Sequence, residues 1–289
     1  MNTIKVKTPA KINLTLDILA KREDGFHSLK SIMQTVNLYD YLTISAIRAD
    51  KTEITLSGTS TEIPYNYSNL AYKATELFLN KVGLSANVNI YIEKNIPIAA
   101  GLAGGSSNAA GVLFGLNKIF DDILSIEQID ELASQLGSDV NFCLHGGTQI
   151  ATSRGEILQK INTPKFNVVL VNPKGVYISA KEAYVNYSNL ENISNNNYSD
   201  LMIEFIEKND VEKIAKNINN NLENGILLNY PVITELKELL IKSGCDNSLM
   251  SGSGSTVFGI YKDELNEIKG ENLSVFYCKT VENGVVIVD

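Results

Sequence analysis

The stretch that decides the fold reads Pro97-Ile98-Ala99-Ala100-Gly101-Leu102-Ala103-Gly104-Gly105-Ser106-Ser107-Asn108-Ala109-Ala110-Gly111-Val112-Leu113. Before it, residues 87–93 alternate between apolar and polar side chains, which predicts a half-buried strand. After it, apolar residues recur at helical spacing up to Leu116. The expected order is therefore strand, glycine-rich loop and helix, with small loop residues that leave the backbone open to a ligand.

The glycine-rich loop has the composition of an anion-binding site. Gly101, Gly104 and Gly105 can adopt positive φ and let a phosphate approach the backbone N–H groups. Ser106 and Ser107 stand where the helix is expected to begin, so they could cap it or turn their hydroxyls toward an anion. The helix dipole there also favours negative charge. A plain Gly/Ser connection between a strand and a core helix is the alternative interpretation.

Two common nucleotide-binding motifs are absent from this loop. No Gly-Lys-Ser/Thr follows at the spacing that a Walker loop requires, and the glycines do not fit G-x-G-x-x-G. The loop therefore favours neither a P-loop fold nor a dinucleotide-binding fold.

Length and composition predict a chain of two domains. The 289 residues are 44% hydrophobic, which is enough for a large core. The composition shifts near Thr163-Pro164, so we expect an N-terminal domain of residues 1–163 and a C-terminal domain of residues 164–289. Strand and helix patterns are mixed along the whole sequence, which predicts the α+β class.

Net charge and cysteine content indicate which binding partners and which cellular compartment to expect for this chain. A net charge of −8 argues against a general nucleic-acid-binding protein, although a local site can still be positive. The three cysteines have neither zinc-site spacing nor a disulfide framework, so we expect buried thiols in a reducing cytoplasm. Neither a signal peptide nor a membrane span is predicted, because polar residues interrupt the apolar runs.

The remaining local patterns place the expected elements. A helix should run from an Asn69 cap to Gly83, and another from a Ser125–Gln128 capping box to Gly137. Residues 187–197 should form a loop. Further helices are expected at 200–206, 211–222 and 232–240. Strands are expected at 5–6, 12–19, 32–36, 41–45, 53–57, 148–153, 166–171, 274–280 and 284–288.

Several polar residues stand where they could face a cleft. Lys11 and Asn13 share one face of an extended segment, although a lysine there could equally be solvated on an edge strand. Asp139 comes between a helix stop and an apolar run, where it could point into a cleft or cap the short helix that follows. His27, one of two histidines, follows an Asp-Gly turn; it could simply satisfy a loop carbonyl, while His145 is interpreted as a turn residue.

Three distant segments together resemble the motifs of the GHMP kinases. Pro9–Leu14 resembles the first motif, Pro97–Ala110 the second and Met250–Phe258 the third, so the resemblance spans nearly the whole chain. Ala103 stands where the family often has glycine, a mild departure because alanine is also small. The resemblance implies a two-domain fold, with an N-terminal domain of the ribosomal-protein β-α-β type, a ferredoxin-like C-terminal domain, and a cleft between them.

The resemblance also implies a catalytic pair. Asp139 would take the proton from the substrate hydroxyl as it attacks the γ-phosphorus of ATP, or would chiefly orient that hydroxyl. Lys11 would support the ionised carboxylate and offset negative charge near the reacting groups, and Asn13 would hold the substrate beside them.

Within the family, the segments Asp24-Gly25-Phe26-His27 and Gly137-Ser138-Asp139-Val140-Asn141-Phe142 resemble members whose small-molecule substrate carries a cytidine diphosphate. His27 would bond the cytosine edge, and Phe26 and Tyr184 would sandwich its ring. Two alternatives remain: a GHMP kinase of a small substrate such as mevalonate or homoserine, and a non-catalytic ligand sensor of the same fold. The sequence leaves the oligomeric state open between a monomer and a weak dimer.

The nucleotide site is also assigned by resemblance. Residues Pro97 to Ser107 would cradle the phosphates of ATP, and Lys94 and Asn69 would contact its adenosine. Mg²⁺ is expected with ATP, held mainly by phosphates, water and a hydroxyl such as that of Ser106; no protein carboxylate ligand is assigned.

Overall fold

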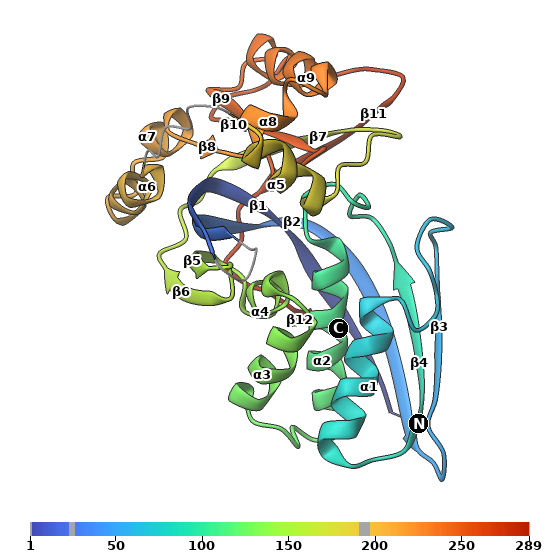
Figure 1. Cartoon of the computed structure of the whole chain (residues 1–289). Helices are drawn as coiled ribbons and strands as arrows, with labels where there is room; N and C mark the ends of the chain where they lie inside the picture. The colour runs from blue at the N-terminus through green and yellow to red at the C-terminus, as the bar shows by residue number, and fades with distance from the viewer. Residues whose placement is uncertain (1, 23–26, 191–196, 289) are drawn as a thin grey trace.

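The computed structural model describes residues 2–22, 27–190 and 197–288, arranged as Figure 1 shows. Over these residues the strands are β1 (Asn2–Lys21), β2 (His27–Arg48), β3 (Glu53–Gly58), β4 (Ala86–Glu93), β5 (Thr148–Ser153), β6 (Ile157–Ile161), β7 (Asn167–Pro173), β8 (Asn219–Asn220), β9 (Asn247–Met250), β10 (Val257–Tyr261), β11 (Leu273–Lys279) and β12 (Val286–Ile287). The helices over the same residues are α1 (Leu70–Val82), α2 (Gly104–Ile119), α3 (Ile126–Leu136), α4 (Ser138–His145), α5 (Ala180–Ser188), α6 (Tyr198–Glu207), α7 (Val211–Lys216), α8 (Glu223–Ile226) and α9 (Pro231–Lys242). The predicted α+β class is confirmed.

The larger sheet is built on a long antiparallel hairpin. Among the described residues it has eight strands, in the main order β12-β1-β2-β4-β3, with β5 and β6 continuing beside β2 and β8 beside β1. β1 and β2 pair from Asn2↔Ala46 to Lys21↔His27, so the four short strands expected between residues 5 and 45 are two continuous ones. Pro9 does not interrupt β1, because the register shifts immediately after it and proline fits at such an irregularity.

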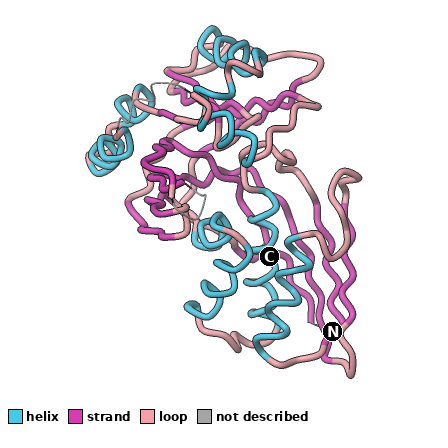
Figure 2. The backbone as a smooth tube through the Cα atoms, in the orientation of Figure 1, coloured by secondary structure: helices cyan, strands magenta, loops and turns pink. Residues whose placement is uncertain are grey.

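The smaller sheet is antiparallel and lies in the second half of the chain. Its order over the described residues is β11-β7-β10-β9, and α9 packs on β9 and β10. The strand expected at 284–288 is the short β12, which does not join this sheet. It pairs with β1 instead, at Val6↔Ile287, so the chain returns to the larger sheet (Figure 2).

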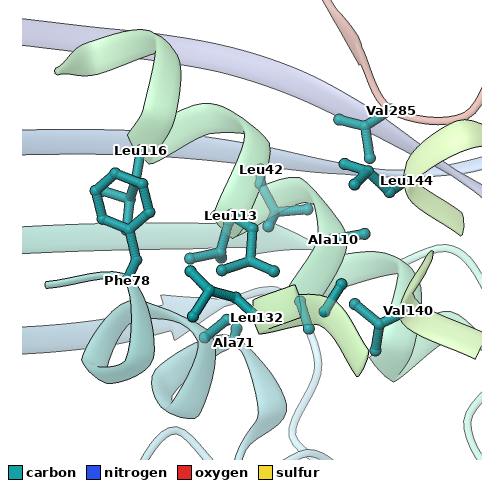
Figure 3. Close-up of a cluster of buried hydrophobic side chains, with 14 of the residues drawn as sticks. Leu42, Ala71, Phe78, Ala110, Leu113, Leu116, Leu132, Val140, Leu144 and Val285 are labelled. Atoms are coloured by element: carbon teal, nitrogen blue, oxygen red, sulfur yellow. The ribbon is translucent and has the colours of Figure 1, made fainter. Parts of the chain in front are cut away.

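Helices α1 to α4 cover one face of the larger sheet (Figure 1). α2 is central, since it contacts β1, β2 and the three other helices. Its Leu113 and Leu116 are buried with Phe78 of α1 and Leu132 of α3 (Figure 3). Gly111 allows α2 to approach β1, because a Cβ there would lie 2.5 Å from Thr8 Cγ2. This close packing holds the middle of α2 against the strand that carries Lys11.

Predictions from local signals are confirmed. Asn69 caps α1 by accepting a hydrogen bond from the Ala71 N–H, and Gly83 ends the helix with φ +66°. Ser125 and Gln128 form the capping box of α3. Each of these signals acts within a few residues, which explains why the sequence reveals it.

Two predictions from longer patterns are wrong. The helix expected at 211–222 ends at Lys216, because the chain then enters β8, which pairs with β1. The loop expected from residue 187 begins later, since α5 continues to Ser188. Across the described ranges, none of the helices combines the length and the apolarity that a membrane crossing requires.

Candidate active site

The glycine-rich loop ends where α2 begins, at Gly104. The N-cap is Ala103, with φ +56° and no side-chain capping bond, so neither serine caps the helix, which was one of the two roles considered for them. Ser106 and Ser107 lie in the first turn, and the buried Ser107 hydroxyl donates to the Pro9 carbonyl oxygen at 2.7 Å. The first N–H groups of a helix have no partner within it, so this turn presents donors suited to an anion.

Positive φ angles in the loop fall partly on residues other than those expected. Gly101 has φ +74°, as predicted, but Gly104 and Gly105 are helical. The other positive values are on Ala99, at +49°, and on Ala103, at +56°. This conformation costs a non-glycine residue roughly 1–2 kcal/mol, and such strain is concentrated at functional sites.

Lys11 and Asp139 meet beside this loop. β1 places Lys11 there through its backbone N–H, which donates to the Leu102 carbonyl oxygen at 3.2 Å. The Lys11 Nζ lies 3.8 Å from Asp139 Oδ2; the lysine side chain is 6% exposed and the aspartate side chain 37%. Asp139 does not cap α4, because the N-cap is Gly137. The carboxylate is thus accessible and has a buried cation beside it.

Asn13 fixes the Lys11 ammonium from the other side. Lys11 Nζ donates to Asn13 Oδ1 at 2.7 Å, and Asn13 Nδ2 donates to Ser31 Oγ at 2.8 Å. The Ser31 hydroxyl donates in turn to the Thr15 carbonyl oxygen at 2.6 Å. This order of donors and acceptors orients the Asn13 amide with its oxygen toward the lysine.

The third glycine-rich segment packs directly on the first two. A Cβ at Gly101 would lie 1.9 Å from the Ser251 carbonyl oxygen, so only glycine permits this approach. Ser251 Oγ donates to the Gly101 carbonyl oxygen at 3.0 Å. A Cβ at Gly252 would lie 3.1 Å from Lys11 Nζ. The structure therefore brings the three segments of the sequence resemblance into one site.

Two cavities adjoin at this site. One, of about 310 Å³, contains Lys11, Asn13 and Asp139 on its wall. The other, of about 1020 Å³, contains His27, with Lys21 and Lys181 among its cationic side chains. Four residues line both cavities and join them: Leu29, Arg154, Ala180 and Tyr184. Cationic groups concentrated here suit an anionic ligand, although the chain is acidic overall.

His27 and Tyr184 form an aromatic pair in the larger cavity. Their ring centroids are 5.4 Å apart and the planes are inclined by 17°, and His27 Nε2 lies 3.2 Å from Ser188 Oγ. Burial and the nearby Lys21 ammonium lower the pKa of His27, which favours the neutral imidazole. Burial and the Asp139 carboxylate raise the pKa of Tyr184 to about 12, so its hydroxyl stays protonated. Phe26, the other expected stacking residue, lies outside the described residues.

The two residues expected to contact adenosine have other partners in this structure. The Asn69 amide caps α1 and also donates to the Pro64 carbonyl oxygen at 2.7 Å. The Lys94 ammonium is buried; it donates to Asp40 Oδ2 at 2.6 Å and to the Ile96 carbonyl oxygen at 2.7 Å. In this structure the ammonium thus supports the base of the loop, and the contacts of Lys94 and Asn69 with adenosine stay a prediction.

Arg154 is a site residue that sequence reasoning missed. It lies between β5 and β6 and contributes to both cavity walls. The Arg-Gly dipeptide between two short apolar segments is a turn signal, but it does not show which way the hairpin points. Only the pairing of β5 with β2 directs this turn to the cleft.

Cys143 lies one helical turn after Asp139 and is fully buried. Burial and the Asp139 carboxylate strongly raise the pKa of its thiol. The side chain is therefore a neutral core thiol, as the sequence suggested, and it is unsuited to act as a nucleophile.

The chemistry of the site suits a metal that arrives with phosphates. In the part of the chain that the structure describes, His, Cys, Asp and Glu form no cluster of three or more that could hold a metal ion. Mg²⁺ commonly binds to one or two protein oxygens and takes its other ligands from substrate phosphates and water. The Ser106 hydroxyl, in the first turn of α2, can supply such a protein oxygen.

Comparison with known proteins identifies the family. Residues 69–147 match the N-terminal domain of the GHMP kinases, and residues 202–277 match their C-terminal domain. The chain belongs to the GHMP kinase family, and its two-domain α+β fold is the fold of that family.

Relatives narrow the assignment. The chain is 43% identical over 275 residues to the 4-diphosphocytidyl-2-C-methyl-D-erythritol kinase of Caldicellulosiruptor bescii, covering 94% of this chain and 95% of that protein. It is 39% identical to the enzyme of the same name from Clostridioides difficile, covering 94% and 91%. A crystal structure of 4-(cytidine 5'-diphospho)-2C-methyl-D-erythritol kinase aligns with a TM-score of 0.79 at 27% identity, over 96% of this chain and 99% of that one. A homoserine kinase from Cytophaga hutchinsonii, at 16% identity and a TM-score of 0.75, shares the fold.

Proposed function

We infer that this chain is an ATP-dependent kinase of 4-diphosphocytidyl-2-C-methyl-D-erythritol, in the methylerythritol phosphate pathway to isoprenoid precursors. Full-length relatives at about 40% identity support the substrate. The observation that carries the assignment to this site is the shared wall of Leu29, Arg154, Ala180 and Tyr184. It joins the cavity of the Lys11–Asp139 pair to the cavity of the His27–Tyr184 pair.

We propose that transfer occurs at the smaller cavity, onto the 2-hydroxyl of the substrate. Asp139 accepts or orients the proton of that hydroxyl as its oxygen attacks the γ-phosphorus of ATP and the bond to ADP breaks. Lys11, held in place by Asn13, offsets negative charge on the reacting groups. Phosphoryl transfer depends chiefly on positioning and charge stabilisation, which these fixed groups supply.

The nucleotide is proposed to lie along the glycine-rich loop. The backbone N–H groups of the first turn of α2 and the dipole of that helix attract the ATP phosphates. We propose that Mg²⁺ is held mainly by these phosphates and by water, with the Ser106 hydroxyl as a protein oxygen. When bound, the ion neutralises phosphate charge.

Recognition of the cytidine end is assigned to the larger cavity. The neutral His27 imidazole can bond the polar edge of cytosine, and the Tyr184 ring can stack on its face. Lys21, Lys181 and Arg154 lie on the same wall, where cations suit a diphosphate. The predicted contribution of Phe26 remains part of this proposal.

The remaining expectations are kept as proposals. We propose a domain boundary between residues 163 and 164, in the connection from β6 to β7, where the chain leaves the larger sheet for the smaller. We propose that the enzyme acts in the cytoplasm on small molecules, as a monomer or weak dimer, without a nucleic-acid or membrane partner.

A substrate panel tests the proposed function. Purified protein is incubated with labelled ATP and Mg²⁺ and with the cytidyl substrate, mevalonate or homoserine in parallel. We expect rapid transfer of label to the cytidyl compound alone. Turnover of mevalonate or homoserine in its place would assign a different GHMP kinase activity. Binding of the cytidyl compound and ATP without ADP formation, whatever the divalent metal, would indicate a sensor.

A further inference from the structure

A short segment outside the three motifs is attached to the strand of Lys11. β8 pairs in parallel with β1 at Thr15↔Asn219 and Leu16↔Asn220. The Asn221 N–H also donates to the Leu16 carbonyl oxygen at 2.9 Å. The asparagine segment 219–221 therefore moves with β1.

The Asn220 side chain extends from this segment to the third glycine-rich turn. Its Nδ2 donates to two backbone carbonyl oxygens, that of Met250 at 2.9 Å and that of Gly252 at 2.7 Å. Its Oδ1 accepts from the Leu222 N–H at 3.0 Å. The residue is 2% exposed, so its amide serves the protein interior rather than a ligand.

The turn held by Asn220 touches two parts of the active site. A Cβ at Gly252 would lie 3.1 Å from Lys11 Nζ and 3.4 Å from Asn13 Oδ1. It would also lie 3.3 Å from the Gly101 carbonyl oxygen, in the phosphate loop. A displacement of this turn would therefore shift the surroundings of the lysine and of the loop together.

A neighbouring carboxylate anchors the start of the same turn. Glu223 Oε1 accepts from the Met250 N–H at 2.6 Å, and the other oxygen pairs with Lys237. Glu223 and the Asn220 amide thus bind both the N–H and the carbonyl of Met250. Met250 is the last residue of β9, and these two side chains pair its buried backbone N–H and carbonyl groups where the strand passes into the turn.

We propose that Asn220 is a positioning residue for phosphoryl transfer, which holds the 250–252 turn against the Lys11 ammonium and the phosphate loop. The inference rests on the proposed function. It adds a role for a residue that touches neither substrate nor nucleotide and that acts through Gly252.

The test replaces one donor by an acceptor. Asn220→Asp keeps the side-chain shape but faces two carbonyl oxygens with a group that, when ionised, donates nothing. Two lost hydrogen bonds in a buried setting should lower kcat/KM for ATP by about tenfold to a hundredfold. Asn221→Asp is the matched control: it is also buried, and its Oδ1 accepts from Asn219 Nδ2, which a carboxylate can still do. We expect that variant to stay within about threefold of wild type.

The pH dependence separates positioning from a general structural defect. Once protonated, the introduced carboxyl can again donate one hydrogen bond to the turn, and burial raises its pKa toward the assay range. The ratio of Asn220→Asp to wild-type kcat/KM should therefore rise as the pH is lowered from about 8 to about 6. A ratio that does not change over this range, or a kcat/KM equal to that of Asn221→Asp, would overturn the inference.

Two further measurements keep the test decisive. If Asn220→Asp fails to fold, Asn220→Ser is the alternative variant. It retains one uncharged donor and should show an intermediate loss of kcat/KM; wild-type kcat/KM in that variant would contradict the role.

Calorimetry with a non-hydrolysable ATP analogue measures nucleotide binding without the second substrate. Weaker binding is expected in Asn220→Asp and not in Asn221→Asp. This contrast still tests Asn220 if wild type fails to phosphorylate the cytidyl compound, a failure that would refute the proposed function alone.

Discussion

Two lysine–aspartate pairs adjoin the glycine-rich loop, and they use their polar atoms differently. In the pair beneath the loop, Lys94 Nζ lies 2.6 Å from Asp40 Oδ2, and the side chains are 5% and 0% exposed. Asp40 Oδ1 also accepts from the backbone N–H groups of Asn95 and Ile96, and Oδ2 accepts from Asn108 Nδ2. This carboxylate ties the segment before the loop to α2 after it, so its role is to fix the backbone.

The pair at the cavity is looser and more accessible. Lys11 Nζ lies 3.8 Å from Asp139 Oδ2, and the Asp139 side chain is 37% exposed. An accessible carboxylate can accept a hydrogen bond from an incoming hydroxyl, whereas one surrounded by protein donors cannot without breaking them. The two pairs have the same residue types. The comparison indicates that a structural ion pair differs from a reactive one in the burial of its carboxylate and in the number of protein donors that already bind it.

The strongest test of this difference is Asp139→Asn. The amide keeps the shape but cannot take a proton, so kcat should fall by about 10²- to 10⁴-fold, with modest changes in KM for either ligand. Steady-state kinetics with the cytidyl substrate measure the effect, and the unfolding midpoint should stay near that of wild type. Undiminished kcat would remove Asp139 from its proposed role.

Asp40→Asn should reverse the pattern and mainly reduce stability. Burial lowers the pKa of Lys94, and the Asp40 carboxylate counters that shift. Loss of the carboxylate leaves the ammonium buried without its anion, which should reduce the free energy of unfolding by about 3–5 kcal/mol. Urea denaturation of Asp40→Asn and Asp139→Asn side by side measures the contrast. Equal losses of stability would show that the two pairs are not distinct in kind.

His27→Ala should weaken binding of the cytidyl substrate while leaving the Lys11–Asp139 pair intact. It therefore separates substrate binding from the chemical step. Loss of the polar contact and of the ring beside Tyr184 should raise KM for the cytidyl substrate roughly tenfold, with little change in kcat or in KM for ATP. His145→Ala is the control. His145 is the last residue of α4 and its imidazole pairs with Asp130 of α3, so its loss should leave KM for the cytidyl substrate unchanged. A large decrease in kcat for His27→Ala would place this histidine in the chemistry instead.

The smallest effect concerns another buried carboxylate, that of Asp17. Burial raises its pKa above the ordinary 3.8, although hydrogen bonds from Ser199 oppose the shift. The folded protein therefore keeps this proton at pH values where the unfolded chain has lost it, and the free energy of unfolding falls as the pH rises through that window. Asp17→Asn does not titrate, so it should gain roughly 1 kcal/mol relative to wild type between about pH 4 and about pH 8. Urea unfolding at both pH values tests this; a gain that shrinks as the pH rises contradicts it.

Local signals in the sequence predicted a large part of the fold. The caps of α1, the capping box of α3 and the alternation of β4 all depend on residues close in sequence. The errors arise where a distant strand decides the conformation. Residues 217–222 leave the helical pattern because β8 pairs with β1, which lies some two hundred positions earlier along the chain.

The same distinction applies to the candidate site. The approach of Lys11 to Asp139 was expected only because separate motifs resemble one family, and no local pattern indicates a distance between them. The Lys94–Asp40 pair was missed, because its residues are 54 positions apart and neither lies in a polar pattern that indicates burial. Such pairs depend on the register of β2 with β4 and on the packing of α2, which emerge only in three dimensions.

The contact between Gly101 and Ser251 also bears on how ligands come and go. The backbones of the loops that carry Gly101 and Ser251 are in close contact. A hinge motion that moved the smaller sheet outward would therefore separate these two loops and disrupt the site. We therefore expect ligands to enter and leave through the permanently open mouths of the two cavities, without a hinge motion of the domains. Substrate access should then respond to side chains at the rims, and it should be insensitive to crosslinks that tie the two sheets together.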